Sequence, residues 1–215
     1  MKAPATRGGH LTYCLNIHPG ESWADVKSAV TLHALAVKAL VVPDAPFGLG
    51  LRLAYGAVEE LRRSGEAASW RNWLAEHGLY VFTVNGFPYG TFHGRPVKTA
   101  VYRPDWRTPE RLNYTLHLAE ALSELLPEGQ DGSISTAPGS YKAWLRGVED
   151  ERQIARQLAA AAAALAVLER RTGREIHLGL EPEPDCMLET TDETVRFFNE
   201  RLIPDGAPAV RTLMG

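Results

Sequence analysis

The residues best suited to chemistry in this sequence come directly after short apolar runs. In a parallel α/β fold the working side chains sit at the carboxyl ends of the strands, so this position selects the first candidates. Glu181 is the strongest of them, because Pro182 restricts it to an extended conformation directly after the run 175–180. Its carboxylate suits a hard divalent cation such as Mg²⁺ or Mn²⁺, and Zn²⁺ also accepts carboxylates. The alternative is that Glu181 and Glu183 are solvated loop acids spaced by prolines.

Two histidines after other apolar runs are candidates for general bases or metal ligands. His18 follows the run 11–17, and His93 lies in the long segment after the run 79–84. Imidazole changes its charge near neutral pH, which suits both proton transfer and metal binding. A lone histidine beside Pro or Gly is more often a hydrogen-bonded turn residue, so both interpretations stay open. His177 lies inside a predicted strand and is interpreted as a sheet residue.

Further polar and aromatic side chains at the same ends of the runs complete the expected substrate site. These candidates for substrate binding are Asn16, Arg52, Asn85, Tyr89 and Trp106. We expect Glu181, His18 and Arg52 to point into one cavity, because parallel strands present their carboxyl ends on one face. The expected catalytic residues are therefore Glu181, His18 and His93, with Glu181 also the expected metal ligand.

A long segment without signals of secondary structure, residues 85–106, follows the third apolar run. Loops of this length in compact domains are usually functional or disordered, and the aromatic content of this one argues against disorder. Exposing several aromatic rings to water would cost hydration free energy. We therefore expect the segment to cover the mouth of the site as a lid, with Phe87, Tyr89 and Phe92 partly buried.

Apolar runs and helical stretches alternate along the chain. Runs typical of buried strands cover residues 11–17, 47–53, 79–84, 132–136 and 175–180, and a helical stretch follows each, directly or after a loop. This alternation predicts an α/β fold with a parallel sheet covered by helices. An open doubly wound sheet and the first part of an eight-stranded barrel both fit the pattern. The sequence contains no glycine-rich nucleotide motif, so the usual signatures of the open sheet are missing.

The predicted domain organisation is simple. Residues 1–10 are expected to form a tail and residues 11–215 one partial barrel domain, whose last residues, from 203 onward, form a short tail. The 215 residues are 45% hydrophobic and 23% charged, which is ordinary for a single globular domain.

Charge, apolar content and cysteines narrow the class of protein. A net charge of −3 gives no electrostatic footprint for nucleic acid. No run approaches the roughly 18 apolar residues that span a bilayer, so membrane insertion is not expected. The two cysteines, Cys14 and Cys186, are too few for a disulfide framework and lie far apart. We expect a cytoplasmic protein whose partner is a small molecule.

Four segments carry a family resemblance. They are LTYCLNIHPGESW (11–23), HGLYVFTVNGFPYGTFHG (77–94), VYRPDW (101–106) and LGLEPEP (178–184). In this order along nearly the whole chain, they resemble the EboE-type metabolite traffic proteins, which belong to the xylose-isomerase-like sugar-phosphate isomerase/epimerase barrels. The resemblance implies an incomplete (β/α)8 TIM barrel with about five parallel βα units.

The resemblance also bears on the metal. In the wider superfamily a carboxylate after the fifth strand is the first metal ligand, and the matching position is Glu181. The remaining ligands come from the sixth, seventh and eighth strands, which have no counterpart here. The implied site for Mg, Mn or Zn is therefore incomplete in this chain. Either the sequence is a truncated product or another chain completes the sheet.

Three functions follow as hypotheses. The first, implied by the resemblance, is an EboE-like protein that handles a small metabolite in an export or biosynthetic pathway. The second is a divalent-metal-dependent sugar isomerase or epimerase, which needs the missing ligands. The third is a non-catalytic truncated fragment. Whether the chain is an enzyme stays undecided.

Since five strands are too few to close a barrel, we expect the first and fifth strands not to pair. The open edges that remain would favour self-association.

Overall fold

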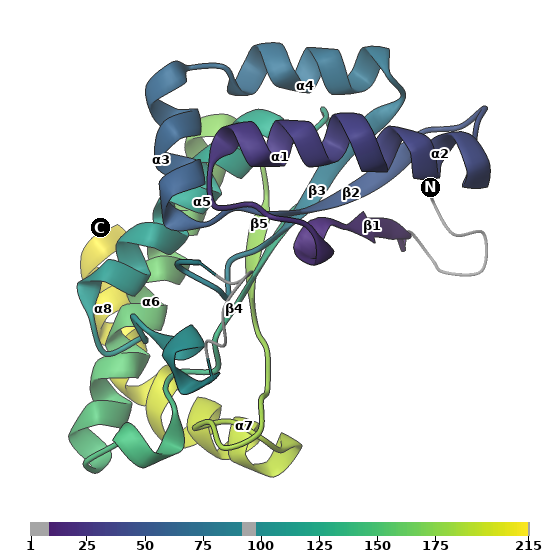
Figure 1. Cartoon of the computed structure of the whole chain (residues 1–215). Helices are drawn as coiled ribbons and strands as arrows, with labels where there is room; N and C mark the ends of the chain where they lie inside the picture. Colours follow the sequence, from purple (N-terminus) through teal and green to yellow (C-terminus); the bar gives the residue numbers. More distant parts are fainter. Residues whose placement is uncertain (1–8, 92–97, 215) are drawn as a thin grey trace.

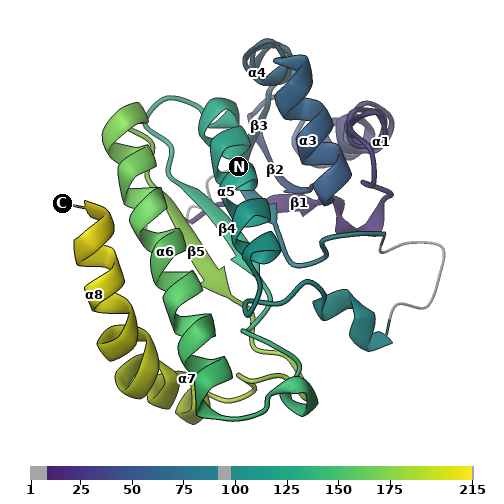
Figure 2. The same ribbon diagram turned by 90° about the vertical axis from the view of Figure 1, so that its left-hand side faces the viewer.

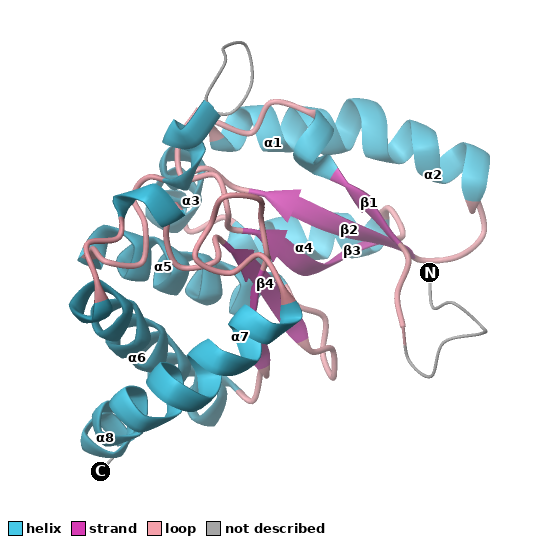
Figure 3. Ribbon diagram, turned by 90° about the horizontal axis from the view of Figure 1, so that it is seen from below, coloured by secondary structure: helices cyan, strands magenta, loops and turns pink. Residues whose placement is uncertain are grey.

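One five-stranded parallel sheet organises the chain (Figure 1). The computed structural model describes residues 9–91 and 98–214. The strands follow one another across the sheet in chain order: β1 (Thr12–Cys14), β2 (Phe47–Arg52), β3 (Leu79–Asn85), β4 (Gly132–Thr136) and β5 (Ile176–Leu180). Figure 3 shows β1, β2 and β3 lying side by side. Within the described residues β1 and β5 form the two edges and do not pair, which confirms the expected open sheet.

Helices connect the strands and cover one side of the sheet (Figures 1 and 2). They are α1 (Trp23–Ala29), α2 (Leu35–Val41), α3 (Tyr55–Ser64), α4 (Ala67–Glu76), α5 (Pro109–Leu125), α6 (Val148–Thr172), α7 (Thr191–Phe197) and α8 (Ile203–Met214). Single π-helical turns, Val30–Ala34 and Phe198–Leu202, join α1 to α2 and α7 to α8. This succession of five βα units is the architecture of a partial TIM barrel.

Local chemistry sets several of the helix boundaries. Ser22 and Thr190 each begin a helix with a complete capping box, in which the third helical residue reaches back to the backbone of the cap. Pro109 occupies the first position of α5, where its missing N–H costs nothing. The helical stretch after β2 is divided into α3 and α4, because Gly65 adopts a left-handed conformation with φ of 66° and ends α3.

Residues 203–214 correct the expectation of a short C-terminal tail, because they form the helix α8. Prolines at 204 and 208 and Gly206 make this stretch a poor helix by propensity alone. Packing outweighs the propensity: α8 lies along α6 (Figures 2 and 3), and a Cβ built on Gly206 would lie only 2.7 Å from Ala159 Cβ. The glycine lets the two backbones approach closely.

The main core lies between the sheet and its covering helices. Alternate strand residues Leu49, Leu51, Val84 and Ile134 are fully buried there and pack with Leu118 and other residues of α3 to α5. Removing one such side chain to alanine typically costs about 2–5 kcal/mol. The outer side of the strands is therefore fixed by hydrophobic packing, and the opposite side, which we call the inner face, carries the other half of the strand residues.

Candidate functional site

Small and polar residues line up across the inner face in two register rows. The upper row runs through the four strands β2 to β5 near their carboxyl ends, and its members are Arg52, Asn85, Ser135 and Gly179. The lower row crosses all five strands two residues earlier, and its members are Cys14, Gly50, Thr83, Ser133 and His177. A β-bulge in the pairing of β2 with β3 after Leu49 places Thr83 opposite Gly50.

Direct contacts show that the lower row shares one face. The Ser133 hydroxyl donates to Thr83 Oγ1 at 2.7 Å. A Cβ built on Gly50 would lie 3.3 Å from Thr83 Cγ2, so the Thr83 methyl group packs closely over the glycine on that face. Their chain neighbours Val84 and Ile134 point the other way into the buried core.

Except for the buried Arg52 and Gly50, the residues of the two rows remain accessible to solvent. Thr83, Asn85, Ser133 and Ser135 are half-buried and His177 is exposed. Bulky branched apolar residues usually fill the interior of a TIM barrel. Here hydroxyl, amide and imidazole groups occupy the corresponding face, and each can donate or accept hydrogen bonds. Such a surface suits a polar ligand with several hydroxyl groups.

Arg52, an expected substrate-binding residue, is held by its own chain. Its side chain is 1% exposed, and both terminal nitrogens lie 3.2 Å from Glu21 Oε1. One of them also donates to the Gly90 carbonyl oxygen at 2.9 Å. Arg52 therefore joins the loop after β1 to the loop after β3 and fixes their positions at the carboxyl ends of the strands.

The other expected substrate-binding residues near these strand ends, Asn85, Tyr89 and Trp106, also contact their own chain. Asn85 Oδ1 accepts from the Phe87 N–H at 2.9 Å and so starts the turn after β3. The ring of Tyr89 stacks on Tyr55 at 4.9 Å, and burial raises its pKa. Trp106 is completely buried, and its indole N–H donates to Thr136 Oγ1 at 3.2 Å. Trp106 is thus a core residue and does not face the inner side of the sheet.

The first candidate histidine lies near the β1 edge. His18 is half-buried, forms a hydrogen bond of 2.8 Å to the Tyr13 hydroxyl and stacks on His33 with ring centroids 4.2 Å apart. Asn16, on the intervening 3-10 turn, has a buried Oδ1 that accepts no hydrogen bond from the described residues. The second candidate, His93, lies outside the described residues.

Glu181 follows β5 directly and is half-buried. Its N–H donates to the Thr136 carbonyl oxygen at 3.0 Å, which continues the pairing of β5 with β4. Strand alternation from His177 and Gly179 puts position 181 on the inner side. Among residues 9–91 and 98–214, no group of three or more His, Cys, Asp or Glu side chains is arranged to hold a metal ion. The described residues therefore do not form a complete site for the expected divalent metal.

The segment 85–106 is packed near its two ends, whereas the described residues 90, 91 and 98–100 are exposed. Phe87 is 8% exposed and Tyr89 is half-buried, as expected of a lid, whereas Phe92 lies outside the described residues. Tyr102 contacts Phe87 edge to face and stacks on Tyr141 at 5.7 Å. Nearby, burial raises the pKa of the Cys186 thiol to about 11, so this cysteine is not a thiolate nucleophile at neutral pH.

Arg111, on α5, binds the backbone of the same segment. This fully buried side chain donates to the carbonyl oxygens of Gly86, Phe87 and Pro104 at 2.8, 2.9 and 2.7 Å. Burial lowers the pKa of Arg111 to about 10, which still leaves it charged at neutral pH. One guanidinium thus satisfies backbone groups at both ends of the segment. Sequence reasoning missed this residue, because an arginine within a helical stretch resembles a surface position.

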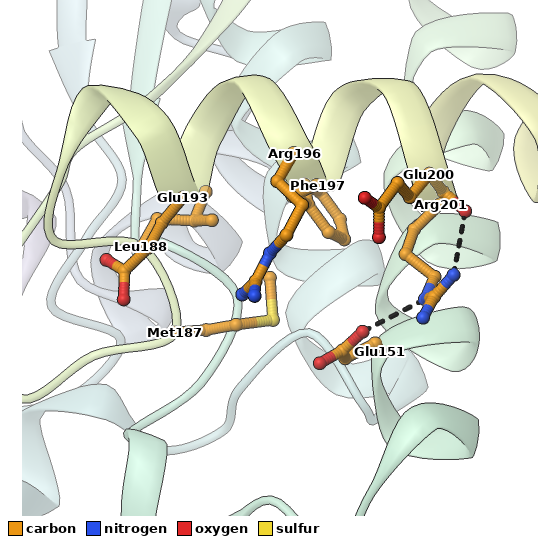
Figure 4. Close-up of a pocket in the computed structure, with 8 residues that line it drawn as sticks. All are labelled: Glu151, Met187, Leu188, Glu193, Arg196, Phe197, Glu200 and Arg201. Atoms are coloured by element: carbon orange, nitrogen blue, oxygen red, sulfur yellow. Dashed lines mark hydrogen bonds and ion pairs between the residues drawn. The ribbon is translucent and has the colours of Figure 1, made fainter.

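A small cavity between α6 and the α7 region is too small for a substrate (Figure 4). Its volume is about 10 Å³, which is about the room one water requires. On one side of the cavity, Arg201 Nε and Glu151 Oε2 form an ion pair at 2.9 Å. This contact ties the helix that follows β5 to α6.

Comparison with known proteins defines the fold. No family model matches the sequence, and no curated protein matches it. Among solved structures, the chain is similar to the xylose isomerase domain protein from Planctomyces limnophilus, with a TM-score of 0.55 and 14% sequence identity. The match covers 91% of this chain and 58% of that one, so the chain spans less than two thirds of its length. The fold is therefore α/β, a partial TIM barrel of the xylose-isomerase-like type.

The sequence held a signal for the two rows. Residues at every second strand position are small or polar: Gly48, Gly50 and Arg52; Thr83 and Asn85; Ser133 and Ser135; His177, Gly179 and Glu181. The candidates named from the sequence include Arg52 and Asn85 of the upper row, whereas Thr83 and Ser133 of the lower row were missed. The bulge after Leu49, which brings Thr83 opposite Gly50, has no marker in the sequence.

Proposed function

We propose that the inner face binds a small, polyhydroxylated metabolite of the sugar class. The observation that carries this proposal is the hydroxyl row on the inner face, centred on Ser133 and Thr83 at 2.7 Å and continued by His177 in register. Sugar hydroxyls both donate and accept hydrogen bonds, and the side chains of the two rows do the same. The fold of a xylose isomerase domain protein and the resemblance to EboE-type metabolite traffic proteins support the same class of ligand.

In this proposal the residues divide into two groups. Thr83, Asn85, Ser133 and His177 contact the ligand, while Arg52 positions the loops around it. Glu181, directly after β5, is proposed to bind a hydroxyl of the metabolite or, when a divalent cation is present, to coordinate that cation.

The proposed role in the cell is handling or traffic of the metabolite. The location of the protein in the cytoplasm stays a prediction. Among the described residues, no helix is both long and apolar enough to span a membrane.

Ligand-observed NMR with a panel of pentoses, hexoses, their phosphates and inositol tests this function. The variants are Ser133→Ala and Thr83→Val, with Thr212→Val on the exposed face of α8 as the matched control. We expect at least one member of the panel to bind the wild type and the control equally. Both row variants should bind it about five- to tenfold more weakly. Binding that is equally strong in all four proteins would contradict the proposal.

The second candidate function is a divalent-metal-dependent sugar isomerase or epimerase, which the structural similarity to a xylose isomerase domain protein favours. It requires a cation at Glu181. Isothermal titration of the protein with Mn²⁺ compares Glu181→Gln with Glu183→Gln, whose acid lies two residues further along the same loop. The metal function predicts loss of Mn²⁺ binding only in the first variant. No heat of binding in the wild type would count against it.

A further inference from the structure

A large cavity lies at the amino ends of β2 and β3, lined by residues that the proposed metabolite site does not include. Its volume is about 760 Å³, well within the range of sites for small molecules. Residues directly before β2 and at the start of β3 form its floor, namely Pro46, Leu79 and Tyr80. The end of α4 and the turn before β4 form its sides.

The cavity follows from the offset of two neighbouring strands. β3 begins at Leu79, but its pairing with β4 begins only at Thr83, opposite Ser133. Beside the first residues of β3 there is therefore no neighbouring strand on the β4 side. The chain reaches β4 through the turn 127–131, which passes around this space.

The walls of the cavity are mostly apolar. They include Ala45, Leu74, Ala75, Leu125 and Pro127. An apolar body that displaced water from these walls would gain about 25 cal/mol for each Å² removed from solvent. A cavity of this size with a mainly apolar lining is the usual form of a binding site for a small organic molecule.

Two oppositely charged side chains, Arg71 and Glu128, line this mostly apolar space, together with the imidazole of His10. The half-buried Arg71, on α4, lines the cavity, and its Nη1 donates to the Glu124 carbonyl oxygen at 3.0 Å. In the part of the chain that the structure describes, Arg71 forms no ion pair with a carboxylate. Its remaining N–H donors are therefore available to an anion, and a guanidinium matches the two oxygens of a carboxylate in geometry.

We propose that this cavity binds an amphipathic carboxylate, with its aromatic or aliphatic body against the apolar walls and its carboxylate on Arg71. The site is independent of the metabolite site on the inner face, since the two share no residue. Loss of sugar binding therefore leaves this proposal standing, and the reverse also holds.

The test uses a matched pair of probes, para-phenylbenzoate and its neutral analogue para-phenylbenzamide, titrated into the full chain by calorimetry. We expect the carboxylate to bind about tenfold more tightly than the amide, because only the carboxylate pairs with Arg71. Arg71→Gln should weaken binding of the carboxylate about tenfold and leave binding of the amide unchanged. Ala75→Trp, which places a large ring in the cavity, should weaken both.

Two substitutions elsewhere serve as controls. Arg171→Gln removes an exposed arginine, and Ala162→Trp adds a ring in a different groove, beside β5. Both should leave the affinities of the two probes unchanged. The proposal is overturned if the carboxylate and the amide bind wild type equally, or if Ala162→Trp abolishes binding while Ala75→Trp does not. The Arg71→Gln comparison stays decisive should Ala75→Trp fail to fold.

Discussion

The hydroxyl of Ser133 lies 2.7 Å from that of Thr83, on neighbouring parallel strands and on the side of the sheet away from the helices. The pair is half-buried, so water can replace either partner. Thr83→Val should therefore lower the free energy of unfolding by less than about 1 kcal/mol. The same change should clearly weaken sugar binding, as proposed above. Chemical denaturation gives the stability, and a loss of several kcal/mol would mean that the pair is structural.

Arg111 should be far more sensitive than its position in a helix suggests. Arg111→Met would leave the carbonyl oxygens of Gly86, Phe87 and Pro104 buried without their donor, at a cost of about 3 kcal/mol or more. Arg111→Lys keeps the charge but has one nitrogen in place of three, so an intermediate loss is expected. Arg63→Met, at an exposed position on α3, is the control. Urea denaturation that gives the same midpoint for both methionine variants would refute this role.

Local sequence signals predict some elements of the fold and not others. The strand Gly132–Thr136 and the order of the five βα units are predictable, because alternation and turn residues mark them locally. The first strand is shorter than its apolar run, since the backbone turns into a 3-10 helix after Cys14. Propensity does not indicate that turn.

The environment of the candidate site is less predictable, because it depends on contacts distant in sequence. Arg52 was expected to bind substrate, but Glu21 and the Gly90 carbonyl oxygen, 31 and 38 residues away, hold its guanidinium. Strand position gives the end of the sheet at which a residue lies. It does not tell which neighbour takes up its hydrogen bonds.

Asp150 should make stability depend on pH in the acid range. Hydrogen bonds from the guanidinium and the backbone N–H of Arg146 hold the pKa of Asp150 at about 2. The unfolded value is about 3.9, so the folded state favours the charged form. This contribution is fully present above about pH 4, and is lost as the pH falls through about 2.

The matched variant for this effect is Asp150→Asn. At about pH 7 it should lower Tm by roughly 3 °C, and at about pH 2 the difference from wild type should disappear. Asp192→Asn, at an exposed position in the first turn of α7, controls for the general loss of a negative charge. Thermal unfolding followed by circular dichroism measures both. A difference between Asp150→Asn and wild type that is independent of pH would refute the electrostatic origin.

Gly206 should be required for the close contact of α8 with α6. A methyl group at this position would lie 2.7 Å from Ala159 Cβ, closer than two carbon atoms approach without displacement. Gly206→Ala should therefore cost about 1–3 kcal/mol, although alanine is the better helix former. Adding Ala159→Gly removes the clash, and the double variant should recover part of the loss. If Gly206→Ala alone stabilises the protein in urea, the packing argument fails.

Self-association through the open sheet edges stays a prediction, and the β1 edge offers a way to test it. Leu32 and Leu40, in the helical stretch that connects β1 to β2, are 64% and 86% exposed, and Ile17 after β1 is 69% exposed. Exposed large apolar side chains and an unpaired strand edge both favour association with another copy. Replacing Leu32 and Leu40 with Glu should shift the protein toward the monomer in size-exclusion chromatography with light scattering. Val148→Glu, at an exposed apolar position far along the chain, should not. A wild type that is monomeric at all concentrations would show that these edges do not associate.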